Sequence, residues 1–208
     1  MDVVPFVPLP PASWTDAAGR DAAVAARDRY AAWLGGELSV PVFLYGPMPG
    51  GAVRTLPQVR QGAFGRFAPD AGPPAPHPTA GATAAGARGV LVAYNMWVSG
   101  SDTALARSVA AAVRAPAVRA LAFDLPSGLQ VSCNLIDPTE VGPAQVHDEV
   151  ARLLAAGGAG IDRCELVGLV PAAVLDAVPR HRWRELGLAE EATIEARLEA
   201  RLEARSLS

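Results

Sequence analysis

The chain has 208 residues, 50% of them hydrophobic and 19% charged, with a formal net charge of −3, as is usual for globular proteins that bury a core. The low charge and the lack of a basic run exclude an electrostatic basis for binding nucleic acid or an anionic membrane surface. All 18 basic residues are arginine, which excludes a Schiff-base lysine and a Walker-type phosphate loop.

The cysteine content and the hydropathy pattern further restrict the class of protein to which the chain can belong. Cys133 and Cys164 are 31 residues apart without paired neighbours, so we expect reduced thiols, with no disulfide framework and no bound metal. No signal peptide begins the chain, and no uncharged apolar run approaches the roughly 18 residues that span a bilayer. We therefore expect a cytoplasmic protein whose partners are small molecules or other proteins.

The first 45 residues predict a strand, a helix and a second strand. Residues 2–9 (DVVPFVPL) and 40–45 (VPVFLY) are apolar and β-branched, and residues 16–38 form an amphipathic helix with Trp33 and Leu34 facing inward. The first strand starts at residue 2 with nothing ahead of it to pair with. This arrangement predicts a βαβ-like half of a domain that is incomplete at its N-terminus.

Residues 68–95 read APDAGPPAPHPTAGATAAGARGVLVAYN. The pattern predicts a stiff loop rich in proline and glycine, then a turn of small residues, then an apolar strand. Structured loops of this length inside compact domains are usually functional. A ligand is therefore expected here first.

The second half of the chain predicts alternating strands and helices. Strands are expected at 90–98, 118–124, 130–136 and 161–169, and helices at 102–114, 143–156 and 171–177. Ser101 and Asp102 start the first of these helices, Gly157 and Gly158 end the second, and residues 126–128 form the turn between the two middle strands. The order βαββαβ predicts an α/β (α+β) fold of the ferredoxin-like type.

The segment from Glu185 onward is rich in Glu, Ala, Arg and Leu and predicts a helical tail. Ile194, Leu198 and Leu202 share one helical face. The stripe fits a surface helix that packs on its own chain, and the alternative is a helix that forms a homodimer.

Seven motifs occur here in the order of one known family: DVVPFVPL, PVFLYG, TLPQVRQG, HPTAGATAAGAR, LVAYN, QVSCNLID and ELVGLVP. On these residues the chain resembles the glutamate formiminotransferases, tetrahydrofolate-dependent enzymes of histidine degradation. The resemblance implies two ferredoxin-like βαββαβ-type subdomains that face each other across a tunnel. Residues 1–90 would be a partial N-subdomain with the folate-binding loop, residues 91–180 the C-subdomain, and residues 181–208 a helical tail.

The family moves a formimino group from N-formimino-L-glutamate to N5 of tetrahydrofolate, a cosubstrate, without a metal. The reaction requires a base for the N5 proton and cations for the glutamate carboxylates. By the resemblance the family's catalytic histidine would precede Met1, so we expect this chain to be inactive as a transferase. The alternative is a non-catalytic folate-binding or protein-interaction module, dimerising to cover its strand edge.

Site residues follow from the resemblance. The loop implied to bind folate comprises Gly72, Pro73, Pro74, Ala75, Pro76, His77, Pro78, Thr79, Ala80 and Gly81. Arg60 and Arg88 flank this loop in family-matching motifs, and they are expected either to contact substrate or to form a surface or inter-subdomain salt bridge. Asn95 and Asn134 are each expected to end an apolar strand, and either to contact substrate or to satisfy backbone groups of the loop.

The remaining histidines and two tyrosines have weaker claims to a role in the site. His77 is a candidate acid or base, whereas we expect His147 to be structural and His181 to be solvated. Tyr45 and Tyr94 are expected either to stack on a pterin or to lie in the core.

Overall fold

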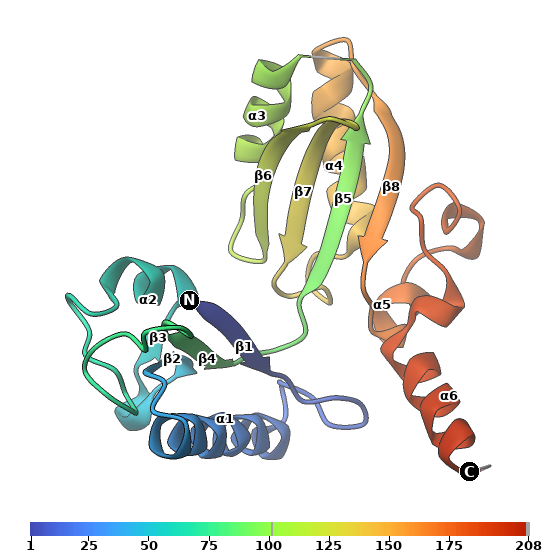
Figure 1. The fold of residues 1–208 in the computed structure, drawn as a ribbon. Helices are drawn as coiled ribbons and strands as arrows, with labels where there is room; N and C mark the ends of the chain where they lie inside the picture. Colours follow the sequence, from blue (N-terminus) through green and yellow to red (C-terminus); the bar gives the residue numbers. More distant parts are fainter. Residues whose placement is uncertain (101, 207–208) are drawn as a thin grey trace. The chain divides into compact units, whose positions relative to one another are not determined.

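The computed structural model describes residues 1–100 and 102–206 and divides into two compact units, Met1–Gly89 and Val90–Ser208 (Figure 1). The protein therefore has an α+β fold with one sheet in each unit. Among the described residues, no helix is long and apolar enough to span a membrane.

The first unit is built on a four-stranded sheet with two α-helices. Its elements are β1 (Asp2–Phe6), α1 (Ala17–Glu37), β2 (Val42–Pro47), the 3-10 turn η1 (Pro49–Gly51), β3 (Val53–Arg54), α2 (Leu56–Gly62) and β4 (Thr83–Ala87). The strand order is β1-β4-β2-β3, with β1, β4 and β2 parallel and β3 antiparallel to β2. β4 thus lies between β1 and β2. The expected βαβ-like half contained the strands β1 and β2 and the helix α1, but no strand between the two.

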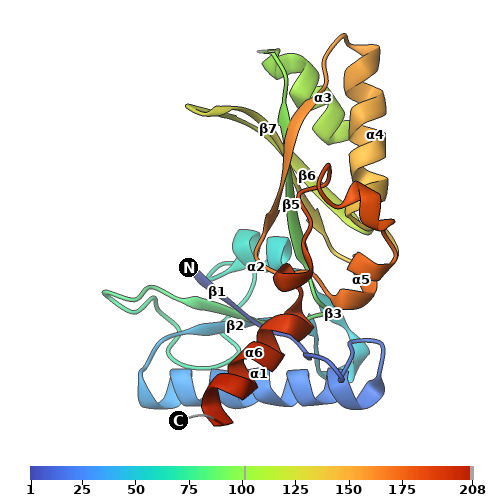
Figure 2. The same cartoon turned by 90° about the vertical axis from the view of Figure 1, so that its right-hand side faces the viewer.

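Helices α1 and α2 cover opposite faces of this sheet (Figure 2). Val42 of β2 packs in one cluster with Ala31 and Leu34 of α1, while its neighbour Phe43 packs in another with Val59 of α2. The alternation follows from the two-residue period of a strand. The prediction that Trp33 faces inward was wrong: its side chain is 51% exposed beside Tyr30, because adjacent helical residues lie about 100° apart.

The turn expected after the proline-rich loop is in fact β4, a central strand. All five residues from Thr83 to Ala87 are buried between β1 and β2. Gly86 leaves room for the Tyr45 ring, since a Cβ at this position would lie 2.0 Å from the ring carbon Cζ. Alanine and glycine have low strand propensity, so the sequence pattern favoured a turn where packing on both faces requires small residues.

The second unit has the predicted βαββαβ order. Its elements are β5 (Val92–Val98), α3 (Thr103–Ala112), β6 (Val118–Leu125), β7 (Gly128–Leu135), α4 (Pro143–Ala156), β8 (Ile161–Val167), α5 (Ala172–Asp176), η2 (Arg180–Arg182), η3 (Glu190–Ala192) and α6 (Ile194–Ser206). The sheet order β6-β7-β5-β8, with every neighbouring pair antiparallel, is the ferredoxin-like arrangement. Asp102 caps α3 by accepting from the Leu105 amide, whereas Ser101 lies outside the described residues.

The core of the second unit lies between the sheet and helices α3 and α4 (Figure 2). Leu186 and Leu188 are buried in this core, and the final helix starts only at Ile194, later than the sequence pattern indicated. On that helix Ile194 is buried while Leu202 is 64% exposed. Among the described residues of this unit, the core cluster lies on one face of the sheet, and Leu121 and Phe123 on the other face are exposed.

Candidate functional site

The base of the loop at residues 72–81 is fixed to β2 and α1. The Val42 amide donates to the Ala71 carbonyl at 2.9 Å, and an Asp70 carboxylate oxygen accepts from the Leu44 amide at 2.8 Å and from Arg54 at 2.7 Å. Gly72, with a φ of +84°, lies close to Gly35 of α1. These contacts fix the position of the backbone where the loop begins.

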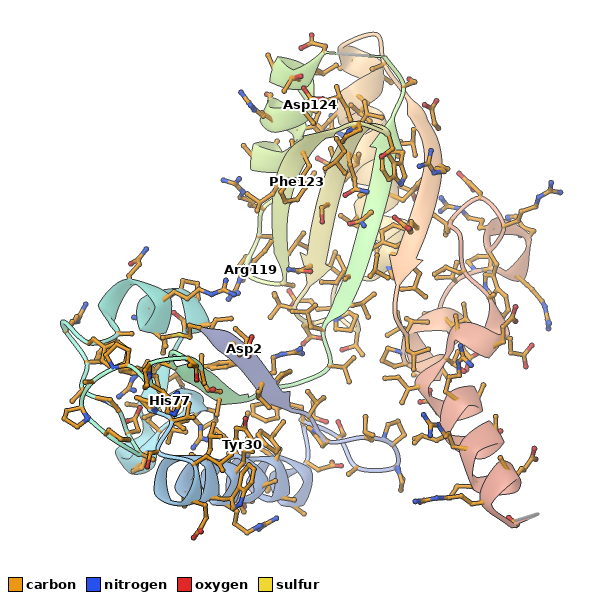
Figure 3. The ribbon with its side chains drawn as sticks, in the orientation of Figure 1. Asp2, Tyr30, His77, Arg119, Phe123 and Asp124 are labelled. Carbon is orange, nitrogen blue, oxygen red and sulfur yellow. The ribbon has the colours of Figure 1, made fainter. Side chains whose placement is uncertain are left out.

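The tip of the loop is organised by His77, which Figure 3 labels. The backbone groups of His77 and Gly81 exchange two hydrogen bonds, of 2.8 and 2.9 Å. The Nδ1 atom of His77 accepts from the amides of Thr79 at 3.3 Å and Ala80 at 3.1 Å. Because Nδ1 accepts, the neutral ring carries its proton on Nε2. The side chains of Pro74, Ala75 and Pro76, between base and tip, are exposed, and so is that of Pro78 in the tip.

The two predicted arginines lie on either side of this loop in the sequence. Arg60 is exposed on α2, and Arg88 follows β4 with its Nη1 donating to the Gly89 carbonyl at 2.7 Å. Arg88 is half-buried.

The two predicted asparagines share the uncovered face of the second sheet. Neighbouring strands place Asn95 beside Ser132, and Asn134 beside Ala93, with side chains on the face opposite the core. Asn95 lies in the middle of β5, not at its end, and its amide nitrogen is 3.4 Å from an oxygen of Glu165. Asn134 is exposed near the end of β7.

An aromatic–guanidinium pair on the same face was missed by the sequence analysis. The guanidinium of Arg163 stacks over the Trp97 ring, 4.0 Å from its centroid. Trp97 is 8% exposed, and among the described residues its Nε1–H has no hydrogen-bond partner. Only the antiparallel register, which sets Trp97 opposite Arg163, reveals this pair. A buried donor without a partner is unfavourable unless a ligand or water satisfies it.

The two tyrosines that were candidates for pterin stacking lie in the cores. Tyr45 is 6% exposed against Gly86, and Tyr94 is fully buried with its hydroxyl donating to the Leu186 carbonyl at 2.8 Å. Burial raises the pKa of the Tyr94 hydroxyl. Both cysteines are free thiols, and burial raises the pKa of Cys133 to about 12, which makes that thiol unreactive.

His147 is structural, as expected from the sequence. Its ring is buried on α4, with Nδ1 3.0 Å from Asp148 and Nε2 3.7 Å from Glu185. Arg182 donates to both carboxylate oxygens of Asp148, at 2.6 and 2.9 Å. The ion pairs among His147, Asp148, Arg182 and Glu185 hold the segment around Arg182 against α4. His181 is exposed, as predicted.

This ion-pair group predicts an acid-dependent loss of stability. The bond from Arg182 lowers the pKa of Asp148 to about 2, below its usual value of about 3.9. A depressed pKa stabilises the fold above pH 4, and the contribution disappears as the pH falls from about 4 to about 2. Because Asp148 is 57% exposed, we expect Asp148→Asn to cost only about 1 kcal/mol or less at pH 7.

Urea unfolding of wild type and Asp148→Asn between pH 7 and pH 2 measures this difference. The two proteins should become equally stable toward pH 2. Glu149→Gln is the matched control on the same helix, because Glu149 pairs with Arg152, one turn away and also exposed, and its loss should cost less. A stability difference that does not depend on pH would contradict the assignment.

Known proteins resemble both units. The sequence-family model described as the formiminotransferase domain, N-terminal subdomain, matches residues 1–88. The chain is 30% identical to the glutamate formimidoyltransferase of Thermoplasma acidophilum, over 93% of this chain and 68% of that protein. It is 33% identical to the formimidoyltransferase-cyclodeaminase of Sus scrofa, over 85% of this chain.

The matches differ in how much of each relative they cover. The chain spans 36% of the length of the Sus scrofa protein and 62% of the glutamate formimidoyltransferase of Streptococcus pyogenes, to which it is 29% identical. The alignments with the Sus scrofa and Thermoplasma acidophilum proteins cover 85% and 93% of this chain, so they include residues of both units. On this similarity and on the two α+β units, the chain belongs to the formiminotransferase family.

Proposed function

We propose that this chain binds tetrahydrofolate and N-formimino-L-glutamate, the ligands of formimino transfer in histidine degradation. The observation that carries the proposal is the family match over residues 1–88, which includes the whole loop at residues 72–81. This loop is fixed at its base by Asp70 and closed at its tip by His77. A preformed loop loses little conformational entropy when a ligand binds, so its rigidity supports a binding role.

Other residues are proposed to contact the polar ends of the ligands. Arg60 and Arg88 have the planar guanidinium that binds carboxylates with two hydrogen bonds. Asn95 and Asn134 offer amides on the uncovered face of the second sheet, and the Trp97 Nε1–H on that face has no hydrogen-bond partner among the described residues. Glutamate carboxylates and the pterin ring present the acceptors that such groups recognise.

The same geometry favours binding over transfer in this chain. In the reaction a bond forms between the formimino carbon and N5 of the folate, the bond from that carbon to the glutamate nitrogen breaks, and a base passes the N5 proton to the departing glutamate nitrogen. His77 is the histidine of the loop, but its Nδ1 already accepts two amides and its Nε2 carries the proton. In this arrangement the Nδ1 lone pair, the basic position of the ring, is directed at the loop's own amides, and the Nε2–H group can donate a hydrogen bond. His147 is occupied by Asp148.

Two measurements separate the two functions, a transferase and a folate-binding module without transfer. Calorimetric titration of the 208-residue chain with 5-formyl-tetrahydrofolate should show micromolar binding, typical of small-molecule affinities of about −8 kcal/mol. A coupled assay with tetrahydrofolate and N-formimino-glutamate should show no transfer. Absence of binding by a folded chain would overturn the folate proposal and leave a protein-interaction module.

Two substitutions of His77 test the role given to its Nδ1 atom. His77→Asn places an amide oxygen near the position of Nδ1, whereas His77→Gln extends to the position of Nε2. We expect the Asn variant to keep its affinity and the Gln variant to lose about tenfold or more, because only the first keeps the loop tip closed. The reverse order would show that Nε2 contacts the ligand directly.

A further inference from the structure

Two side chains that only donate hydrogen bonds lie in contact on the face of the second sheet opposite its core. The register of β5 and β8 sets Trp97 opposite Arg163, and the guanidinium lies 4.0 Å from the centroid of the indole ring. Trp97 is 8% exposed, and within residues 1–100 and 102–206 its Nε1–H has no hydrogen-bond partner. Arg163 cannot supply one, because a guanidinium carries five N–H donors and no acceptor. The pair therefore lacks an acceptor for the indole.

The guanidinium of Arg163 also lacks a counter-ion. Its side chain is exposed, and among the described residues it stacks on the Trp97 ring without forming an ion pair. Exposed side chains change rotamer within nanoseconds, so the guanidinium can move far enough to admit a ligand atom to Nε1 of the indole. A carboxylate oxygen accepts from both groups at once, and a hydrogen bond between a carboxylate and a guanidinium is stronger than a neutral one. The pair is therefore suited to an anion.

The next pair of residues on the same face adds a negative charge. The register sets Asn95 of β5 opposite Glu165 of β8, two residues along each strand from Trp97 and Arg163. The Asn95 amide nitrogen lies 3.4 Å from a carboxylate oxygen of Glu165, which draws this carboxylate toward β5. Neighbouring strands lie about 5 Å apart, and residues two apart on a strand about 7 Å. These four side chains form a block with a cation and an anion at adjacent corners.

We propose that the block of Trp97, Arg163, Asn95 and Glu165 binds the head group of an α-amino acid. The ligand carboxylate accepts from the Nε1–H of Trp97 and from the guanidinium of Arg163, and the cationic nitrogen beside it donates to the carboxylate of Glu165. A ligand with only an anion would be repelled by Glu165, and a ligand with only a cation would be repelled by Arg163. The block therefore selects ligands that carry both charges on neighbouring groups.

Side chains of the adjacent strand β7 favour a ligand with a second carboxylate. Gln130 lies opposite Trp97 and is 6% exposed. Ser132 lies opposite Asn95 on the same face. An amide and a hydroxyl thus offer donors about 5 Å from the block, within reach of the side-chain carboxylate of L-glutamate. N-formimino-L-glutamate has the same two carboxylates beside a cationic amidine, so the choice of glutamate rests on the proposed function, whereas folate is not required.

Titration of the full chain with L-glutamate, followed through the indole N–H signals in proton–nitrogen NMR spectra, tests the proposal. The chain has four tryptophans, and the signal that Trp97→Phe removes belongs to Trp97. We expect this signal to move downfield as the carboxylate accepts from it, and to saturate with a Kd of about 0.1–1 mM. The signal of Trp183, whose Nε1 already donates to the Val178 carbonyl at 2.9 Å, should not move. A Trp97 signal that stays in place would overturn the proposal.

Two substitutions of exposed residues separate the carboxylate contact from the amine contact. Arg163→Gln should weaken the binding of L-glutamate by about tenfold or more, and that of glutarate, which has no amine, by a similar factor. Glu165→Gln should weaken L-glutamate by about tenfold but should bind glutarate at least as tightly as wild type does, because only L-glutamate brings a cation. Equal losses of both ligands in Glu165→Gln would refute the amine contact.

Arg119→Gln is the matched control for the loss of a positive charge. Figure 3 labels Arg119 on β6, where it is exposed on the same face. It lies three strand spacings from Arg163, about 14 Å, and exposed charges interact only over about 8–10 Å. Binding of L-glutamate should therefore be unchanged in this variant. A loss in Arg119→Gln as large as that in Arg163→Gln would show that net charge, and not the block, attracts the ligand.

A parallel titration with 5-formyl-tetrahydrofolate keeps this inference separate from the proposed function. Binding of the folate without a response of the Trp97 signal to L-glutamate would overturn the inference and leave the proposed folate site intact. A response to L-glutamate by a chain that does not bind the folate would support the block and overturn the folate site.

Discussion

Arg27→Met is expected to lower the free energy of unfolding of the first unit by about 2–5 kcal/mol. The Arg27 side chain is 1% exposed within the unit, and its Nη1 donates to the carbonyls of Tyr45 at 3.1 Å and Pro47 at 2.6 Å. Methionine fills the space but leaves both carbonyls without this donor, at about 1–3 kcal/mol each. Since domains are stable by only about 5–15 kcal/mol, the loss should loosen the end of β2.

Hydrogen exchange measures this loss unit by unit, which a single melting curve does not. Amides of β2 should exchange faster in Arg27→Met, while those of β7 in the second unit serve as an internal reference. Asp28→Asn is the matched control: Asp28 accepts from Nε of Arg27 at 2.8 Å but is 49% exposed, so its loss should cost below about 1 kcal/mol. Equal losses in the two variants would assign the effect to the ion pair and not to the carbonyls.

Gly35→Ala and Gly36→Ala, neighbours on α1, are expected to change stability in opposite directions. An added Cβ at Gly35 would lie 2.6 Å from the Gly72 nitrogen and 2.9 Å from the Ala71 carbonyl carbon, both backbone atoms of the loop base. We expect this clash to destabilise the unit by about 1–3 kcal/mol. At Gly36 nothing lies within 4 Å of the added atom, so helix propensity should stabilise it by about 0.5–1 kcal/mol.

The pair also connects the fold to the proposed ligand site. Because Gly35→Ala displaces the start of the loop at residues 72–81, affinity for 5-formyl-tetrahydrofolate should fall by about tenfold, while Gly36→Ala should bind as wild type does. Chemical denaturation and calorimetry of the two variants measure both effects. Stabilisation by both substitutions would show that α1 does not hold the loop. Destabilisation by Gly35→Ala without a change in affinity would place the folate elsewhere.

The sequence proposes the candidate site as a set of residues, and it does not give their arrangement in space. The loop at residues 72–81 stands out in the sequence because its prolines and glycines restrict the backbone locally. The acceptor role of the His77 Nδ1 atom depends on the turn that brings the Thr79 and Ala80 amides to it. The Arg163–Trp97 stack arises only from strand register, and no spacing of 66 residues along a chain predicts such a contact.

The sequence by itself determined the ferredoxin-like order of elements in the second unit. The turn between β6 and β7 and the helix α4 at residues 143–156 are two examples. Those elements have strong local signals: apolar periodicity, an N-terminal proline, terminal glycines and a turn sequence. Tertiary structure alone decided that Thr83–Ala87 is the central strand of the first unit and that Arg27 is buried beneath β2. Small residues and a buried cation are locally unfavourable in these places, and they are stabilised only by neighbours that are distant in sequence.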